Sequence, residues 1–363
     1  MNVHQLATQY VAGVDLHKRS VTICIMDLRG NIILERTFGR RKTARLSACL
    51  APYGTDITIG VEATFNWYWL SDWCDERGIP CVLGHPLYLR RKAIGKNKSD
   101  RIDARHMATL LRLNDFPCTA PYPLEWRATR DLARQRTVFT AMQTALKLRR
   151  GCIEEQHLLS ERHELLLNGG RARWYADVWT GFDTAEPVLD VLAQQIRAIE
   201  QRLEQQGPLH FPAGYALLSA VHGIGTVLAS TVLYEIGALE RFPTVQDFSS
   251  YCRVVTPQCD SDGKRVGYGN VRSGNPYLCW ALHFMVETTR RRTPQIESLF
   301  KELKRRRGLR DAHRILAHQW AVTIYFMLKN QEPFSLERFL YRFRGTVAQG
   351  APIQCSGHAA DVA

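Results

Sequence analysis

Short apolar runs separated by turn residues fill the first third of the chain, and longer helix-like stretches follow. Apolar runs of this length, ended by Gly, Pro, Asn or Asp, are typical of strands. They predict strands at 10–15, 21–27, 32–38, 57–62 and 80–83. Apolar residues spaced three and four apart predict helices at 43–50, 67–77 and 99–113, the last with Ser99 as its N-cap.

The predicted order is three consecutive strands and a helix, followed by strand, helix, strand and helix. This order is typical of an α/β RNase H-like domain. A proline-bearing break at 115–123 ends it, and helical stretches follow at 125–168 and 186–206. The second stretch carries a heptad seam, which fits either a hairpin within one chain or a dimerising coiled coil. The seam consists of Leu189, Leu192, Ile196, Ile199 and Leu203.

The charge balance narrows the class of partner. The chain has 48 Lys and Arg against 35 Asp and Glu, a net charge of +13, and such an excess favours nucleic acid or an anionic membrane. No apolar run approaches the ~20 residues of a membrane span, and we expect no signal peptide. The ten cysteines form no Cys-x-x-Cys pair, which argues against a zinc ribbon and fits a reducing compartment. We therefore expect a cytoplasmic protein that binds nucleic acid.

Four carboxylates are the strongest candidates for chemistry. Asp15 and Glu62 each end an apolar run, whereas Asp100 and Asp103 lie three residues apart at a helix start. Strand ends and a helix start can bring carboxylates together around one or two Mg²⁺ ions, which prefer such oxygen ligands. Taken singly, each acid also fits a turn residue, a helix cap or a complement to the helix dipole.

Basic residues cluster beside the second carboxylate pair and again near the C-terminus. Segment 90–105 holds seven basic and two acidic residues, and segment 289–314 holds ten and three. Both fit contacts with a phosphate backbone, and a solvated basic surface is the alternative. The candidates are Lys98, Arg101, Arg105, Arg290, Arg291, Arg305 and Arg306.

A Gly-Ile-Gly sequence at 223–225 lies between two predicted helices. Such a turn is similar to a helix-hairpin-helix, in which backbone N–H groups hold a phosphate. Gly223 and Gly225 would then contact nucleic acid. A tight turn between helices with no ligand is the alternative.

Three N-terminal segments resemble the DEDD transposases of bacterial insertion sequences, whose nuclease domain is RuvC-like. They are Gly13 to Lys18, Val61 to Trp69, and Asn97 to Arg105, the last being the most specific. The region from 208 resembles the C-terminal domain of the same family. The resemblance there is carried by 223–225, 248–251, 256–257 and 274–278.

The resemblance implies four regions. They are a RuvC-like (RNase H-like) nuclease domain at 1–123, an α-helical coiled-coil region at 124–207, a mostly α-helical C-terminal transposase domain at 208–345, and a flexible tail at 346–363. It also implies a nucleophilic serine that links covalently to a DNA phosphate. Ser261 stands at that place, although Asp262 follows where the family usually has glycine, and Ser273 is the second choice. Lys264, Arg265 and Arg272 would ease ionisation of the serine.

We therefore interpret the chain as an insertion-sequence transposase that cleaves and rejoins DNA with Mg²⁺. The resemblance implies that its partners are element-end DNA, target DNA and a structured guide RNA encoded by the element. A homodimer or homotetramer associated with the bacterial nucleoid is expected. The alternatives are a RuvC-like structure-specific nuclease and a non-catalytic basic DNA-binding protein. A proofreading-type exonuclease would need Asp-x-Glu at 15–17, and a sugar kinase would need a smaller turn at 17–19.

Overall fold

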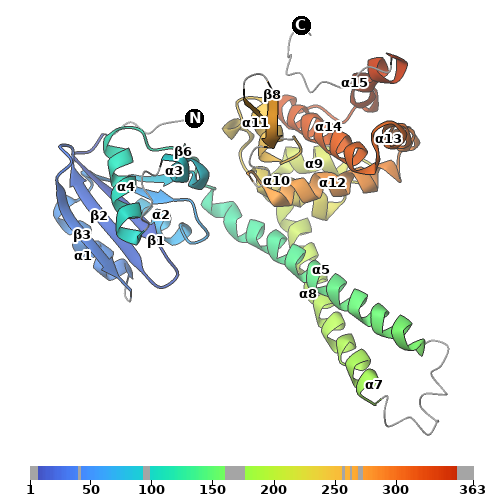
Figure 1. The fold of residues 1–363 in the computed structure, drawn as a ribbon, viewed down its shortest axis with the longest axis horizontal. Coiled ribbons are helices and arrows are strands. Elements are labelled where there is room, and N and C mark those ends of the chain that lie inside the picture. Colours follow the sequence, from blue (N-terminus) through green and yellow to red (C-terminus); the bar gives the residue numbers. More distant parts are fainter. Residues whose placement is uncertain are drawn as a thin grey trace. The chain divides into compact units, whose positions relative to one another are not determined.

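The computed structural model describes residues 7–39, 42–92, 99–159, 176–255, 258–261, 264–268 and 273–349. At 258–261, 264–268 and 344–349 it describes the secondary structure alone. The chain divides into two compact units, Met1–Pro121 and Tyr122–Ala363 (Figure 1). Within the described ranges, no helix is long and apolar enough to cross a membrane.

The first unit is built on a mixed six-stranded sheet with the order β3-β2-β1-β4-β5-β6. Strands β1, β2 and β3 form an antiparallel meander, whereas β4 lies parallel to β1, and β5 lies parallel to β4. This sheet is compatible with the predicted RNase H-like class. The strands are Tyr10–Leu16, Val21–Asp27, Ile32–Phe38, Ile57–Glu62, Cys81–Gly84 and Cys118–Thr119.

The five predicted strands are confirmed, and β6 is an addition. This two-residue strand lies in the proline-bearing break and pairs antiparallel with β5. The helices of this unit are α1 (Lys42–Leu50), α2 (Tyr68–Asp75), α3 (Pro86–Lys92) and α4 (Asp100–Arg112), with the short 3-10 helix η1 at Ala51–Tyr53. Helix α3 was not predicted from the sequence, because its seven residues are too few to show a period.

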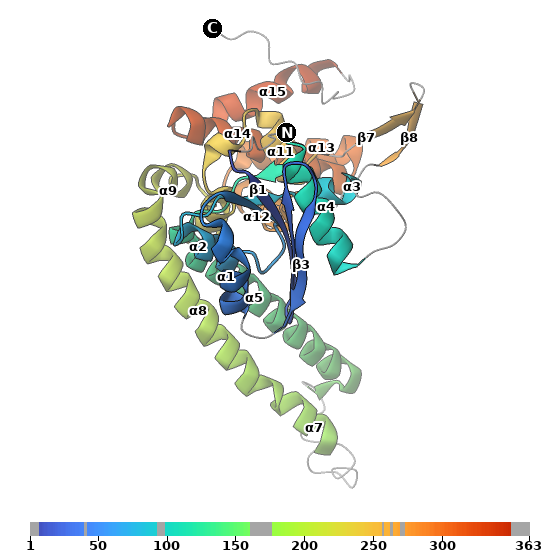
Figure 2. The same cartoon turned by 90° about the vertical axis from the view of Figure 1, so that its left-hand side faces the viewer.

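Helix α4 packs directly on β1 and β2 (Figure 2). Buried apolar residues of the helix, Met107 and Leu111 among them, form one cluster with Val11 and Met26 of the sheet. The predicted N-cap is confirmed, because the Ser99 hydroxyl accepts a hydrogen bond from the Ile102 backbone N–H at 3.3 Å. This cap fixes where the helix begins.

A glycine in β1 allows the helix to lie against the backbone of the strand. A Cβ built on Gly13 would stand 2.0 Å from the carbonyl oxygen of Ala104 and 2.5 Å from the backbone nitrogen of Ala108. Both obstacles are main-chain atoms, so no side-chain rotation could relieve the clash. The close contact between α4 and β1 therefore depends on the absence of a side chain at residue 13.

The second unit begins with two long helices, α5 (Leu124–His157) and α8 (Ala185–His210), which pack against each other within the chain (Figure 1). The short helix α7 (Ala176–Asp183) precedes α8. All five apolar seam residues of α8 are buried. Arg136 on α5 forms an ion pair with Glu200 on α8 at 2.7 Å. Helix α8 continues four residues beyond its predicted end and passes through Pro208.

A helical bundle completes the second unit around a large apolar core that includes Trp320 and Phe248. Its elements are α9 (Pro212–Ser219), α10 (Thr226–Ile236), η3 (Leu239–Arg241), α11 (Val245–Tyr251), β7 (Gln258–Ser261), β8 (Lys264–Tyr268), α12 (Pro276–Arg290), α13 (Pro294–Arg307), α14 (Leu309–Asn330) and α15 (Leu336–Gln349). Helix α15 covers 346–349, so the start of the predicted tail is helical. Residues 350–363 lie outside the described residues.

A buried carboxylate fastens α5 to this bundle. Glu235 of α10 is 1% exposed and accepts hydrogen bonds from the guanidinium groups of Arg130 and Arg134, at 2.9 and 2.6 Å. The Asn275 side-chain amide donates to the same carboxylate at 2.7 Å, and its oxygen caps the first N–H groups of α12. Burial opposes ionisation of Glu235, but the two arginines outweigh it and lower its pKa.

We expect Gly13→Ala to lower the free energy of unfolding of the first unit by about 3 kcal/mol, because the added methyl group meets main-chain atoms. Chemical denaturation followed by tryptophan fluorescence measures the change. Gly151→Ala, in the last third of α5, is the control, since a Cβ there meets no atom within 4 Å. This control should gain up to about 1 kcal/mol. Equal stability of Gly13→Ala and wild type would contradict the close packing.

Candidate active site

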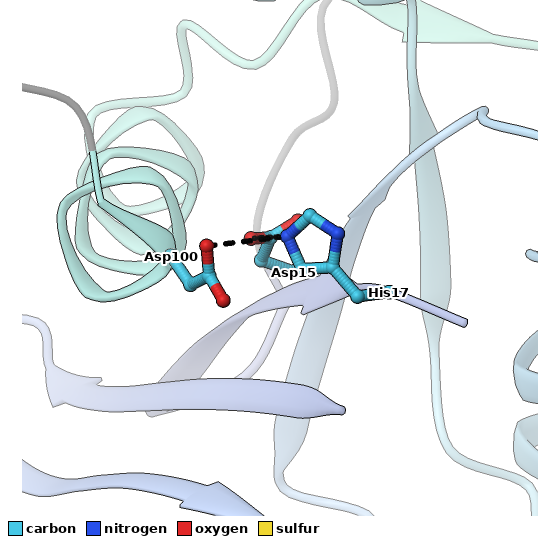
Figure 3. Close-up of side chains that lie close together, drawn as sticks. All are labelled: Asp15, His17 and Asp100. Carbon is cyan, nitrogen blue, oxygen red and sulfur yellow. Dashed lines mark hydrogen bonds and ion pairs between the residues drawn. The ribbon is translucent and has the colours of Figure 1, made fainter. Parts of the chain in front are cut away.

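Three side chains from β1, the residue after it and α4 meet at one edge of the sheet. The His17 Nε2 atom lies 3.0 Å from Asp15 Oδ2 and 3.2 Å from Asp100 Oδ1 (Figure 3). The potential metal-ligand atoms of these three residues all lie within 4.8 Å of one another. The Asp15 side chain is only 13% exposed, whereas the other two are about half exposed. The arrangement is a partly buried cluster of negative charge, bridged by an imidazole.

Local geometry explains why these residues meet. Side chains at i and i+2 project to the same side of an extended chain, so His17 follows Asp15 on one face. The loop after β1 is held by Lys42, whose ammonium group donates to the carbonyl oxygens of His17 and Lys18, both at 2.9 Å. Asp100 is the first residue of α4, and the helix dipole favours a carboxylate there.

Glu62 and Asp103 belong to the same edge of the sheet. Glu62 ends β4, which lies parallel to β1 with Val61 opposite Val14. The register therefore places the residues that follow this pair, Glu62 and Asp15, at the same level of neighbouring strands. Asp103 lies in the first turn of α4 and acts electrostatically on Asp15. The described ligand cluster contains Asp15, His17 and Asp100, without Glu62 or Asp103.

The pKa of Asp15 is raised above its ordinary value. Burial is the largest cause, and the charges of Asp100 and Asp103 raise it further. His17 opposes the shift through its charge and its hydrogen bond. The site thus carries negative charge that the surrounding protein does not fully neutralise, and a bound cation would lower its energy.

The donor atoms fit a hard divalent cation. Carboxylate oxygens are the ligands that Mg²⁺, Mn²⁺ and Ca²⁺ prefer, and they come here from a strand end and a helix start. Imidazole nitrogen is a poorer ligand for Mg²⁺ than for zinc or iron. The carboxylates could therefore hold such a cation, and His17 contacts both Asp15 and Asp100.

Sequence reasoning did not select His17 as a site residue. It used the residue only within a motif and as an argument against other enzyme classes. The signal was present, because a polar side chain two positions after a strand-end aspartate lies on the same face. The other partner of His17, Asp100, is 83 positions away in sequence, so their meeting could be found only through the packing of α4 on β1.

Two of the three predicted phosphate-binding residues of the first unit, Arg101 and Arg105, lie on α4. Arg105 pairs with Glu35 of β3 at 2.7 Å, and Arg101 approaches the same carboxylate at 3.8 Å. Both side chains are at least half exposed. They fix the helix to the edge strand and still present donors to solvent. Lys98 lies outside the described residues.

The predicted nucleic-acid-binding arginines of α12 and α13 differ in how far they are exposed and in how many ion pairs they form. Arg290 is 21% exposed and bonds to both Glu287 and Glu297, at 2.6 and 2.9 Å, so its main role here is to join the two helices. Arg291 and Arg305 are over 70% exposed, although each approaches a glutamate of its own helix. Arg306 pairs with Glu302 and is 30% exposed. The predicted basic surface is thus partly neutralised.

The Gly-Ile-Gly turn joins α9 to α10. Gly223 has a positive φ of 98°, and a Cβ there would lie 2.8 Å from the carbonyl oxygen of Thr288, so this glycine is explained by packing against α12. Gly225 begins α10 with no side-chain cap. The turn lines a pocket together with Arg197, Glu200 and Glu204. The two glutamates disfavour a phosphate in this pocket.

Ser261 and two of its basic neighbours, Lys264 and Arg265, lie on a two-stranded hairpin. Ser261 ends β7 opposite Lys264 of β8, and Asp260 pairs with Arg265. Arg272 lies outside the described residues. Ser273 directly precedes Gly274, whose Cβ would meet the carbonyl oxygen of Tyr251 at 2.5 Å.

We expect Asp103→Asn to lower the pKa of Asp15, because one of the charges that raise it is removed. His17→Ala should raise it further, since a group that lowers it is lost. Carboxyl ¹³C titration by NMR without divalent ions measures both shifts. Asp27, whose low pKa comes from hydrogen bonds with Asn31, is the internal control and should not move. Shifts of opposite sign would refute the assigned electrostatic cluster.

Comparison with known proteins agrees with this geometry. A DEDD-type IS110 model described as "Transposase" matches residues 12–152, and the model "Transposase IS116/IS110/IS902 family" matches 215–301. A protein named "Probable family 20 transposase" from Pseudomonas aeruginosa is 26% identical over 284 residues, which are 73% of this chain and 80% of that protein. The "Transposase for insertion sequence element IS1328" from Yersinia enterocolitica is 24% identical over 281 residues, 73% and 79% of the two chains.

The two family models cover the carboxylate site and the Gly-Ile-Gly region, and both describe transposases of one group. Two relatives named as transposases align over most of the chain. The chain therefore belongs to the IS110/IS116/IS902 family of insertion-sequence transposases, enzymes of the DEDD type that act on DNA.

Proposed function

We propose that this transposase excises and integrates its element by Mg²⁺-dependent cleavage and rejoining of DNA strands at the carboxylate site. The observation that supports this most is the convergence of Asp15 and Asp100, with Asp103 acting electrostatically on Asp15. Ordinary acidic residues on a protein surface are solvated and far from like charges. Asp15, in contrast, is 13% exposed and has other carboxylates near it.

In this proposal Asp15, Glu62, Asp100 and Asp103 hold one or two Mg²⁺ ions. The ion supplies charge stabilisation to a phosphate under attack and lowers the pKa of a bound nucleophile. Asp15 is the central ligand because it is the least exposed. Asp100 and Asp103 approach from α4, so the helix sets the spacing of the ligands. His17 keeps the two aspartates oriented until DNA and metal bind.

We assign the nuclease domain to 1–123, a coiled-coil region to 124–207 and the C-terminal transposase domain to 208–345. The compact unit that ends at Pro121 supports the first assignment. The packing of α5 on α8 supports the second. The separate core around Trp320 supports the third. Residues 346–363 would be an appendage without a catalytic role.

DNA and the proposed guide RNA would contact the exposed basic residues. Arg101 and Arg105 stand on the helix that carries two of the acids, and Lys98 precedes it in sequence. On α12 and α13, Arg291 and Arg305 are the most exposed of the four arginines that we select there. The net charge of +13 supports a polyanionic partner, and excision with rejoining supports a dimer or tetramer that brings several sites together.

Ser261 is our candidate for the covalent step. Its hydroxyl oxygen would attack the scissile phosphorus and lose its proton, and the bond to one sugar oxygen would break, so that this oxygen leaves as a hydroxyl. In the second half, a hydroxyl at the incoming DNA end would attack the phosphoserine and release the serine. Lys264, Arg265 and Arg272 lie near in sequence and would stabilise the serine alkoxide.

Asp15→Asn should reduce excision of the element by about 10³-fold, because the amide removes charge and one metal ligand while keeping the shape of the side chain. Asp103→Asn should act similarly. Excision is measured as the yield of circular element junctions in cells. Asp75→Asn, on the exposed end of α2, is the control and should keep wild-type activity. Full activity of Asp15→Asn would remove the metal-site proposal.

A covalent protein–DNA adduct should form with wild-type protein and withstand denaturing electrophoresis. Ser261→Ala should abolish the adduct and reduce recombination by about 10³-fold or more, since alanine has no hydroxyl to attack the phosphorus. Ser273→Ala is the matched control and should keep the adduct. An adduct that persists in Ser261→Ala but disappears in Ser273→Ala would transfer the role to Ser273.

A further inference from the structure

A phenylalanine stands almost fully in solvent beside the carboxylate site. Phe65 is 80% exposed, the largest value among the large apolar side chains that the structure describes. It lies three residues after Glu62, in the turn between β4 and α2. An exposed phenylalanine gives up the ~2 kcal/mol that burial of such a side chain provides. A functional contact is one reason for such a residue to face solvent.

The turn that carries Phe65 is well held. The Ala63 N–H donates to the Gly84 carbonyl at 2.9 Å, and the Thr64 hydroxyl donates to the Asn66 side-chain oxygen at 2.9 Å. Trp67, 8% exposed, anchors the far end of the turn and packs edge-to-face on Tyr68. A rigid support of this kind presents the ring at low entropic cost.

A second aromatic ring follows the next strand. Glu62 lies opposite Gly84 in the sheet, so His85 and α3 begin at the edge that carries the acids. Tyr88 of α3 is 40% exposed. Its ring lies 4.8 Å from that of His85, and the Arg91 guanidinium stands 5.7 Å from its centroid. Aromatic rings beside cations are the pattern of a surface for unpaired bases.

The other side of the acids is basic. The loop between β1 and β2 carries Lys18 and Arg19, both exposed, and Lys42 holds this loop through two carbonyl groups. Along this edge of the sheet the order is therefore basic loop, Asp15, Glu62, the Phe65 turn and α3. Neighbouring strands are ~4.8 Å apart, so these features follow one another at short intervals.

We propose that Phe65 stacks on an unpaired nucleobase of the DNA strand next to the phosphate held by the carboxylates, with Tyr88 as a second stacking ring farther along. This rests on the proposed function of the carboxylate site. Lys18 and Arg19 would contact backbone phosphates on the opposite side of the scissile bond. A protein partner would require a contiguous apolar patch, whereas the neighbours of Phe65 along this edge are charged or singly placed rings.

The test is stacking itself, measured with 2-aminopurine, whose fluorescence falls when it stacks on an aromatic ring. The probe is a duplex with the joined ends of the element and 2-aminopurine at single positions on either side of the cleaved bond. The full chain is purified from cells that also transcribe the flanks of the element. Fluorescence is read before a divalent ion is added, and strand cleavage is read after its addition.

Wild-type protein should quench the probe at one flank, and Phe65→Ala should lose this quenching and cleave roughly 5- to 150-fold more slowly. Phe65→Trp should retain both, because tryptophan also stacks. Phe65→Leu, which keeps an apolar side chain but no ring, should behave like Phe65→Ala. Leu28→Ala is the control, since Leu28 is 48% exposed in the turn at the opposite edge of the sheet.

Several outcomes would overturn the inference. Phe65→Ala with unchanged quenching and cleavage, while Asp15→Asn is inactive, would remove the stacking role and leave the metal site intact. Phe65→Leu with wild-type behaviour would indicate an apolar contact with protein in place of stacking. Failure of the metal-site proposal would be recognised separately, because in that case Asp15→Asn would cleave DNA like the wild-type protein. Thermal unfolding checks that each variant is folded, and an 80% exposed side chain should not change it.

Discussion

The contact of α4 with the backbone of β1 is the constraint on which the active site depends. Helix and strand meet at Gly13 more closely than any side chain allows, and two residues later the strand presents Asp15. The N-cap at Ser99 then decides that the helix begins with Asp100. The spacing of acids from distant parts of the chain thus follows from one glycine and one hydroxyl. A motif with glycine two positions before aspartate has a steric as well as a chemical reason.

Asp15, Asp100 and Asp103 lie close together at this edge of the sheet although their negative charges repel one another. Burial raises the pKa of Asp15 most, and the charges of Asp100 and Asp103 add to it. The sheet and helix bear this cost because each acid is attached to a rigid element. His17 reduces the cost by bonding to two carboxylates. A site of this kind is arranged before its cation arrives. The strand and helix that carry Asp15 and Asp100 hold the negative charge in place, and fixed charge of this kind favours electrostatic catalysis.

The strands and α4 could be predicted because their apolar periods and caps are local signals. Elements set by tertiary contacts escaped prediction: β6 has two residues, and its pairing with β5 defines it. The sequence predicted a site at the four acids, and the structure brings Asp15 and Asp100 together. The contacts of His17 with both could be found only from its distances to them. For the basic residues, sequence showed charge but could not show that Arg290 is engaged by two glutamates. An ion pair between two helices leaves no periodic pattern in the sequence, so it cannot be predicted from one.

The buried carboxylate of Glu235 has a mechanical consequence. Two arginines of α5 and one asparagine at the start of α12 share it. Twisting α5 near its N-terminal end would break these ion pairs and leave a buried charge without a partner, which costs ~3–5 kcal/mol. Helix α5 should therefore move as a rigid body that is held to the bundle at Glu235. Because Asn275 also caps the start of α12, a torque applied at the far end of α5 would be transmitted to α12.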